Sequence, residues 1–216
     1  MTVRRVLTVC GSLQPRSANR AAIDVARRYL EAQPDVEVDD LTDLAGIPPL
    51  DPDPDHEAGP AVEQWRAQIA HADAVLVAAP EYAGALAGTI KNALDWIVGS
   101  GELYAKPVAV LSAGTTGGPF ARQHLIQTLT WQGAHVVADV GIAAPRTKSD
   151  TEGRYTDPAT VRAIEALTAV LLEAVTMPAD DRLALVRTIV DAPGLGPHGN
   201  VADQPGIELA GEAHPE

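Results

Sequence analysis

The segment Ala74-Val-Leu-Val-Ala-Ala79 is wholly apolar and is followed at once by Pro80. Such a run predicts a β-strand that is buried on both faces of a parallel sheet. A second run of this kind, Pro107-Val-Ala-Val-Leu-Ser112, stops at a glycine-rich loop. Shorter strand patterns cover residues 6–10, 36–41 and 134–138, and apolar residues recur at helical spacing in 19–32, 61–72, 89–98, 120–132 and 158–175.

The predicted strands and helices alternate along the chain five times. This alternation predicts an α/β fold in which helices cover both faces of a parallel sheet. Five strands with right-handed crossovers favour the doubly wound order 2-1-3-4-5 over the six-stranded dinucleotide-binding fold. Ligands of such sheets bind beyond the carboxyl ends of the strands. We therefore expect a site in the loops that follow the first, third and fourth strands.

The charge balance and the cysteine count exclude several classes of protein. The 216 residues include 29 acidic and 16 basic side chains, which gives a formal net charge of −13. A negative surface disfavours binding to nucleic acid or to an anionic membrane. The single cysteine, Cys10, rules out an intramolecular disulfide and a CxxC zinc site. No apolar run reaches the ~18–20 residues of a membrane span, so we expect a cytoplasmic protein.

The chain is predicted to contain one domain, residues 1–177, and an acidic extension rich in glycine and proline, residues 178–216. The extension is expected to be largely flexible apart from a short helix at 180–190. Residues 46–57 form a second unusual segment, rich in proline and aspartate. Its aspartates resemble the start of a calcium loop, but His56 stands where that loop needs glycine. A stiff, solvated loop is the favoured interpretation.

Loop one, residues 11–19, joins the first strand to the first helix. It contains neither G-x-G-x-x-G nor Gly-Lys-Ser/Thr, so it predicts neither a dinucleotide fingerprint nor a P-loop. Its polar side chains, together with the free N–H groups of a helix start, suit a terminal phosphate. These side chains are Ser12, Arg16, Ser17 and Asn19. The alternative is that Ser17 only caps the helix, and both roles are compatible.

Loop two lies in the segment 79–96, where small residues such as Gly84 allow a flat ligand to approach the backbone. Tyr82 adds an aromatic ring with a polar tip. The alternatives are an exposed turn acid for Glu81 and a core or interface aromatic for Trp96. Lys91 and Asp95, four residues apart, are expected to pair on the helix surface.

Loop three, residues 112–119, has three glycines in five positions. Backbone N–H groups in such a loop can converge on an acceptor, although a plain flexible turn is the alternative. A phosphate cradle, a wall of small residues and a glycine nest at one sheet edge together fit a flat cofactor with one phosphate, namely FMN. Donors at the ring edge would stabilise the negative charge that develops there on reduction.

Three motifs occur in the order G-S-L-x-x-x-S-x-N, P-E-Y-x-x-x-x-x-G-x-I-K-N-A-L-D-W and S-x-G-x-x-G-G. In this order and spacing the sequence resembles the NADPH-dependent FMN reductase family, over about residues 6–171. The resemblance implies a flavodoxin-like fold and relatives that include quinone, azo-dye and chromate reductases. The chain differs from many members in having Gln14 in place of an arginine and Ala83 in place of an asparagine.

The resemblance also implies roles for residues of the three loops. The FMN phosphate would contact Ser12, Arg16, Ser17 and Asn19. The ring and the ribityl chain would lie against Pro80, Glu81, Tyr82 and Gly84, largely through backbone groups. The polar edge of the ring would be closed by Ser112, Gly114 and Gly118.

The predicted activity is transfer of hydride from NADPH or NADH through bound FMN to a quinone, an azo compound, free flavin or a similar acceptor. No side chain is predicted to act as a catalytic acid or base, and no metal is expected. The alternatives are an FMN-binding electron carrier or binding module without NAD(P)H turnover and, less favoured, a nucleotide-dependent transferase. Arg122 is a candidate for contact with the 2′-phosphate of NADPH.

The expected partners are a small-molecule acceptor and further copies of the chain, as a homodimer or homotetramer. The helix at 89–98, with Trp96, is a candidate interface. Cys10 is expected to be a small core residue, and the histidines, which show no ligand spacing, are expected to be structural: His56, His71, His124 and His135.

Overall fold

The structure is a computed structural model, and it describes residues 3–41, 44–53 and 58–190. It contains a five-stranded parallel sheet with the order β2-β1-β3-β6-β7. The five strands are β1 (Arg4–Cys10), β2 (Val36–Leu41), β3 (Ala74–Ala78), β6 (Pro107–Gly114) and β7 (His135–Ala143). Since β6 and β7 are the fourth and fifth strands of this sheet, the predicted order 2-1-3-4-5 is confirmed.

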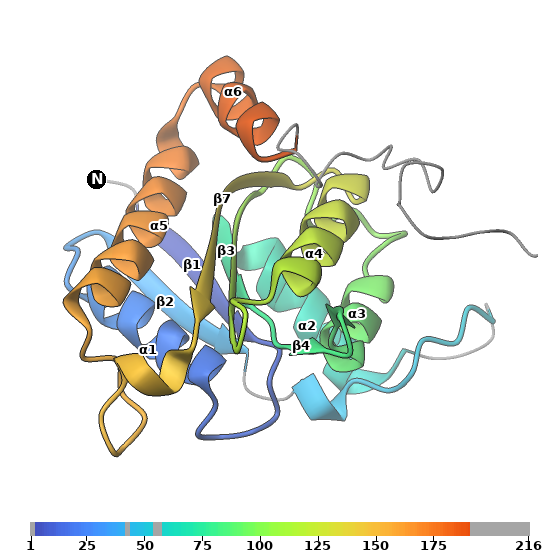
Figure 1. The fold of residues 1–216 in the computed structure, drawn as a ribbon. Coiled ribbons are helices and arrows are strands. Elements are labelled where there is room, and N and C mark those ends of the chain that lie inside the picture. Colours follow the sequence, from blue (N-terminus) through green and yellow to red (C-terminus); the bar gives the residue numbers. More distant parts are fainter. Residues whose placement is uncertain (1–2, 42–43, 54–57, 191–216) are drawn as a thin grey trace, which may run out of the picture.

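Helices cover both faces of the sheet (Figure 1). One face carries α1 (Ala18–Glu31) and α5 (Pro158–Thr176); the other carries α2 (Gly59–His71), α3 (Gly88–Asp95) and α4 (Pro119–Trp131). Successive residues of β3 enter opposite cores, because side chains alternate along a strand. Leu76 packs with the α1–α5 core and Val77 with the α2–α4 core. Burial on both sides explains why the central strands are wholly apolar.

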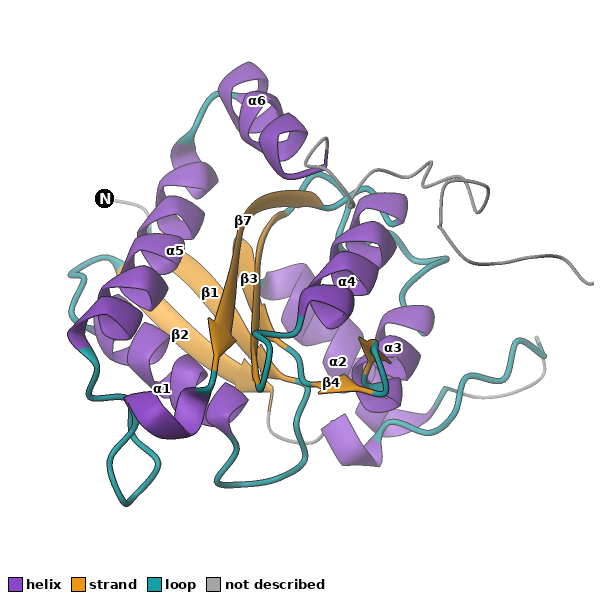
Figure 2. Cartoon of the chain, in the orientation of Figure 1, coloured by secondary structure: helices purple, strands orange, loops and turns teal. Residues whose placement is uncertain are grey.

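The segment after Pro80 is more ordered than the predicted long turn. It forms a short antiparallel hairpin of β4 (Glu81–Tyr82) and β5 (Ala85–Leu86). Strand β7 also runs beyond the predicted end at 138, and short 3-10 helices occur at η1 (Leu44–Gly46) and η2 (Pro145–Lys148). The loops after β1, β3 and β6 all meet at one end of the sheet, at the lower edge in Figure 2.

The predicted short helix near the C-terminus is present as α6 (Ala179–Val190). It packs against β7, where Arg182 Nε donates to His135 Nδ1 over 3.0 Å. A second nitrogen of Arg182 donates to the carbonyl of Ala174. The rest of the predicted flexible extension, residues 191–216, lies outside the described residues, so the proposed division at 177 stays a prediction.

Helix α3 anchors the proline-rich segment. Asn92 accepts from the N–H of Leu50 and donates to the carbonyl of Pro48, both over 2.8 Å. The indole N–H of Trp96 donates to the same carbonyl over 2.7 Å, and Trp96 is only 5% exposed. Trp96 is therefore a core residue, and the role of the helix at 89–98 as an interface stays a prediction. Asn92 and Trp96 thus bind the same segment from one side of α3.

No metal site appears in the proline-rich segment or elsewhere in the described part of the chain. Asp51 accepts from the N–H of Asp53, as in a turn. Asp55 and His56 lie outside the described residues. Within residues 3–41, 44–53 and 58–190, no group of three or more His, Cys, Asp or Glu side chains could hold a metal ion. Among the same residues, no helix is long and apolar enough to span a membrane.

Candidate functional site

Loop one ends in a capped helix. Ser17 Oγ accepts from the N–H of Arg20 over 3.0 Å, which makes Ser17 the N-cap of α1. Ser12 Oγ accepts a longer bond, 3.4 Å, from the N–H of Gln14. The side chain of Arg16 is exposed, whereas Ser17 is buried. The capping interpretation of Ser17 is thus correct, and the first turn of α1 points its N–H groups toward the loop.

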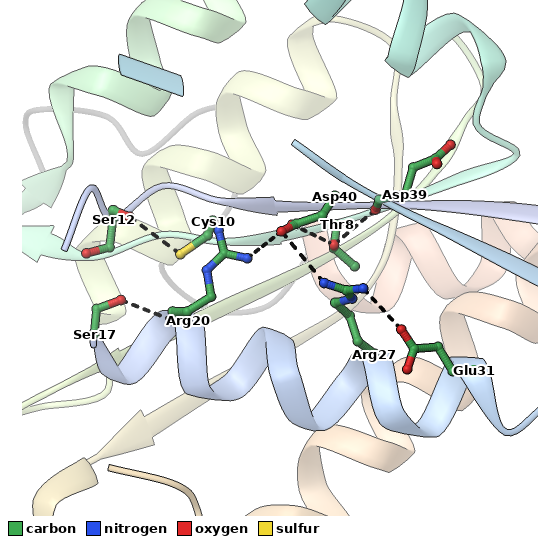
Figure 3. A network of polar contacts seen from close by, with 9 residues as sticks. All are labelled: Thr8, Cys10, Ser12, Ser17, Arg20, Arg27, Glu31, Asp39 and Asp40. Atoms are coloured by element: carbon green, nitrogen blue, oxygen red, sulfur yellow. Dashed lines mark hydrogen bonds and ion pairs between the residues drawn. The ribbon is translucent and has the colours of Figure 1, made fainter. Parts of the chain in front are cut away.

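A fixed ion-pair network lies behind loop one (Figure 3). Arg20 pairs with Asp40 at 2.7 Å, and Asp40 also accepts from the hydroxyl of Thr8. The Cys10 thiol donates to the carbonyl of Ser12 over 3.7 Å. Burial raises the pKa of that thiol, so Cys10 stays neutral and behaves as the predicted core residue.

A cavity of about 370 Å³ opens on the β2 side of loop one. Its lining includes Cys10, Ser12, Gln14, Arg20, Leu41 and Leu44. Loops two and three follow β3 and β6, which lie on the opposite side of β1. The cavity therefore adjoins loop one but lies away from the other two loops.

Asn19 ties loop one to loop three. Its Nδ2 donates to the carbonyl of Ala113 over 3.1 Å, and its Oδ1 accepts from the N–H of the same residue over 2.9 Å. Asn19 is only 3% exposed. The side chain thus acts as a two-point clamp between residues that are 94 positions apart. This engagement of Asn19 was not foreseen from the sequence.

Loop two forms its hairpin with two residues at positive φ. Ala83 has φ 51° and Gly84 has φ 70°, as a tight two-residue turn between twisted strands requires. Tyr82 is 61% exposed, and Phe120 of α4, 52% exposed, lies beside the turn. Pro80 is buried at the end of β3. The hairpin region therefore carries two exposed aromatic side chains.

Glu81 ties loop two to the helix that follows loop three. Its Oε2 accepts from the N–H groups of Phe120 and Ala121, over 2.8 and 3.0 Å. These N–H groups belong to the first turn of α4, whose N-cap residue, Gly118, has no side chain to cap the helix. Glu81 is thus a helix cap supplied from a distant loop. The interpretation of Glu81 as a merely exposed turn acid is wrong.

Ser112 and Gly118 come into direct contact within loop three. The hydroxyl of Ser112 is buried and has no hydrogen-bond partner. A Cβ added to Gly118, whose φ is +60°, would lie 2.0 Å from that hydroxyl oxygen. Only glycine fits there. By contrast, a Cβ on Gly114 would meet nothing within 4 Å, so the space beside Gly114 is open.

Two further side chains, which the sequence did not single out, hold loop one by hydrogen bonds from other elements. Thr89 Oγ1 donates to the carbonyl of Gly11 over 3.2 Å and links loop two to loop one. The phenol of Tyr155, which precedes α5, donates to the carbonyl of Ala18 over 3.3 Å. Burial raises the pKa of Tyr155, so the phenol stays protonated as this bond requires. The threonine stands at an unspecified position of the long motif, and its partner is 78 residues away.

Two of the predicted structural histidines, His124 and His135, make contacts between elements. His124 Nδ1 accepts from the N–H of Leu86 over 3.4 Å, which ties α4 to the hairpin. His135 accepts from Arg182. The predicted surface pair of Lys91 and Asp95 is confirmed, with 2.6 Å between nitrogen and oxygen.

Comparisons with known proteins agree with this geometry. The family model described as NADPH-dependent FMN reductase matches residues 4–149. An NAD(P)H-dependent FMN reductase of Pseudomonas aeruginosa is 38% identical over 161 residues, which cover 71% of this chain and 85% of the relative. An NADPH:quinone oxidoreductase of Arabidopsis thaliana is 32% identical over 168 residues, 72% of this chain and 84% of the relative.

Solved structures show the same architecture. The flavoenzyme NAD(P)H:(acceptor) oxidoreductase of Paracoccus denitrificans superposes with a TM-score of 0.67 and 26% identity, covering 80% of this chain and 97% of its own. A flavodoxin of Bacillus cereus, at 15% identity and a TM-score of 0.52, shares the fold over 78% of this chain and 97% of its own. The chain belongs to the NADPH-dependent FMN reductase family and is an oxidoreductase that uses FMN and NAD(P)H.

Proposed function

We propose that the three loops hold FMN, with its phosphate at loop one and its ring between the hairpin and loop three. The observation that carries this placement is the buried, unpartnered hydroxyl of Ser112 beneath Gly118. Among the described residues, Ser112 Oγ is one of several buried side-chain atoms without a partner, and it is the one that lies within the three loops, so it supports a ligand contact there. The residues present therefore fit a flat ligand with hydrogen-bonding edges.

Loop one supplies the groups for the phosphate. The first turn of α1 offers free N–H groups and the positive end of the helix dipole, and Ser17 already points its oxygen there. Ser12 and the exposed Arg16 add a hydroxyl and a guanidinium. Asn19 serves chiefly to hold loop three against loop one, because both ends of its amide are bound to Ala113.

Loops two and three supply the walls for the ring. Pro80, Glu81 and Gly84 shape the hairpin through the backbone, Gly118 packs closely over Ser112, and Gly114 leaves room for close approach of a planar group. Bound FMN supplies two-electron chemistry between a nicotinamide nucleotide and an acceptor. The protein orients both reactants and excludes water from one ring face, and no side chain needs to move a proton.

The acceptor class that fits the site best is a quinone. Tyr82 and Phe120 are both more than half exposed beside the hairpin, where they offer flat apolar surface to a planar acceptor. Relatives named as quinone oxidoreductases support the same choice. Azo compounds and free flavin are further candidates because they are also planar.

We also propose that the protein works in the cytoplasm as a homodimer or homotetramer. Its one cysteine is a free thiol, which suits a reducing compartment.

Two exposed aromatic side chains support the proposed assembly. Tyr104 and Trp131 are 78% and 74% exposed, and such aromatic surface is typical of association sites. Light scattering tests the state directly, and a monomer that turns over quinone would count against the assembly.

The central experiment is an absorbance titration of the purified protein with FMN, followed by anaerobic NADPH and then a quinone. We expect FMN to bind at micromolar concentration, its absorbance to bleach on addition of NADPH, and the quinone to restore it. Bound FMN that NAD(P)H leaves unchanged would favour the electron-carrier alternative. A protein that takes up no FMN would refute the proposed function.

Variants of Ser17 test the phosphate placement. Ser17→Ala should weaken FMN binding by about 1–3 kcal/mol, the scale of a hydrogen bond to a charged group. Ser17→Asp is the matched variant, since aspartate also caps a helix but repels a phosphate. It should retain the stability of the wild type and still bind FMN weakly. An unchanged affinity in both variants would remove Ser17 from the phosphate site.

A further inference from the structure

Arg122, in the first turn of α4, is engaged on both sides of its guanidinium. Its Nε donates to the carbonyl of Gly117 in loop three over 3.3 Å. Its NH1 forms a hydrogen-bonded ion pair with Asp139 of β7. The two side chains are 24% and 16% exposed. A guanidinium already neutralised by a half-buried carboxylate is poorly suited to recognise a second anion.

Loop three lies directly on β7 at this point. Gly117 has φ +81°, and a Cβ added to Gly141 of β7 would lie 2.6 Å from the Gly117 carbonyl oxygen and 3.0 Å from Arg122 Nε. The neighbouring backbone groups are also joined, by a bridge between Thr116 and Ala143. Arg122 therefore covers a close contact between loop three and the sheet.

We infer that Arg122 and Asp139 form a clamp that positions loop three for the flavin. The inference rests on the proposed function, because the loop matters only if its N–H groups face FMN. Arg122 is accordingly a positioning residue, and it does not contact the 2′-phosphate of NADPH as the sequence suggested. The clamp needs the planar fork of arginine, which reaches the Gly117 carbonyl and the Asp139 carboxylate at once.

One substitution distinguishes the clamp from a phosphate-binding role of Arg122, because only the clamp needs the planar guanidinium. Arg122→Lys keeps the positive charge, so a phosphate-binding role would largely survive it, whereas a two-point clamp would not. Asp139→Asn removes the anchor of the clamp without changing shape. Gly141→Ala pushes on the Gly117 carbonyl and leaves all charges in place. Arg187→Gln, an exposed position on α6, is the control for loss of one positive charge.

Three quantities should be measured for these variants: the FMN dissociation constant, the KM values for NADPH and NADH, and hydrogen–deuterium exchange of residues 112–121 in the protein without FMN. We expect Arg122→Lys, Asp139→Asn and Gly141→Ala each to weaken FMN about ten-fold, roughly the loss of one hydrogen bond to a charged group. Exchange in 112–121 should become faster. The ratio of the two KM values should stay unchanged, and Arg187→Gln should match the wild type.

Two results would overturn the clamp. One is wild-type FMN affinity and wild-type exchange in both Arg122→Lys and Asp139→Asn. The other is a selective rise in the KM for NADPH with no change in exchange, which would return Arg122 to nucleotide recognition. If the wild type itself takes up no FMN, the proposed function fails, and the exchange measurement still decides whether Arg122 and Asp139 hold loop three.

Discussion

The two ends of the sheet are held together in different ways. At the carboxyl end, side chains reach from one loop to the backbone of another, as Asn19 does to Ala113 and Glu81 does to Phe120. At the amino end, side chains fasten helices: Lys106 Nζ donates to the carbonyl of Ile69, over 2.7 Å, and to that of Ala72, the C-cap of α2. The carboxyl end thus fixes loops in place, whereas the amino end stabilises the helices around the sheet.

This difference separates two kinds of mutational effect. With FMN placed as proposed, pre-organised loops matter for ligand affinity as well as for stability, because their shape then forms the binding site. Contacts that only dock a helix matter for stability alone. Substitutions at the carboxyl end should therefore lower FMN affinity and stability together, and those at the amino end should lower stability only.

The largest effect is expected from Gly118→Ala. The new Cβ would collide with the hydroxyl of Ser112 and would also sit at a φ of +60°, so the loop must move. Overpacking of this kind, with the strain of a left-handed residue, should cost about 3 kcal/mol in the free energy of unfolding. Urea unfolding and an FMN titration measure the two consequences. Gly114→Ala, with open space around it, is the control and should retain stability.

Removal of the cap on α4 should come next. Glu81→Ala leaves two N–H groups of the helix start without their acceptor and should lower stability by about 1–2 kcal/mol. Glu81→Gln keeps an acceptor oxygen and should lose less stability.

At the amino end of the sheet, Lys106→Met removes the side chain that caps α2 and should lower stability without changing FMN affinity. Equal losses of FMN affinity in Glu81→Ala and Lys106→Met would contradict the proposed difference between the two ends of the sheet.

Two alanines at positive φ offer a gain instead of a loss. Ala83, in the hairpin, has φ 51°, and Ala105, near the amino end of β6, has φ 55°. Asparagine tolerates this conformation better than alanine, so each Ala→Asn change should stabilise the protein by about 0.5–1 kcal/mol. Thermal unfolding measures the gain. Only Ala83→Asn should also change FMN affinity, and a change in Ala105→Asn would contradict the proposed separation.

The smallest effect concerns the pH dependence of α6 docking. Burial, and then the charge of Arg182, lower the pKa of His135 below its usual value of about 6.5. The folded protein therefore favours neutral His135, and this contribution to stability is present above about pH 6.5 and declines as the pH falls below it. The stability difference between pH 7 and pH 5 should shrink in His135→Gln. An unchanged difference would show that another group carries the pH dependence.

The sheet could be predicted from the sequence because burial on both faces leaves long apolar runs, such as Ala74 to Ala79. The hairpin could not, since strands of two residues have no detectable period and Ala83 replaces the usual turn residue. The loops of the candidate site could be chosen from topology alone. The partners of Asn19, Glu81 and Arg122 could not, because each lies on another element and only the packed sheet brings them together.

The Asn19–Ala113 clamp also sets an order of events during synthesis. Strand β1 and helix α1 are complete by residue 31, yet loop one gains its two fixed points only after residue 113 has left the ribosome and β6 has joined the sheet. In the same way, Glu81 can accept its two hydrogen bonds only after residues 120 and 121 have been synthesised. The end of the sheet proposed to bind FMN therefore cannot be completed before residue 121 has been synthesised, when more than half of the polypeptide exists.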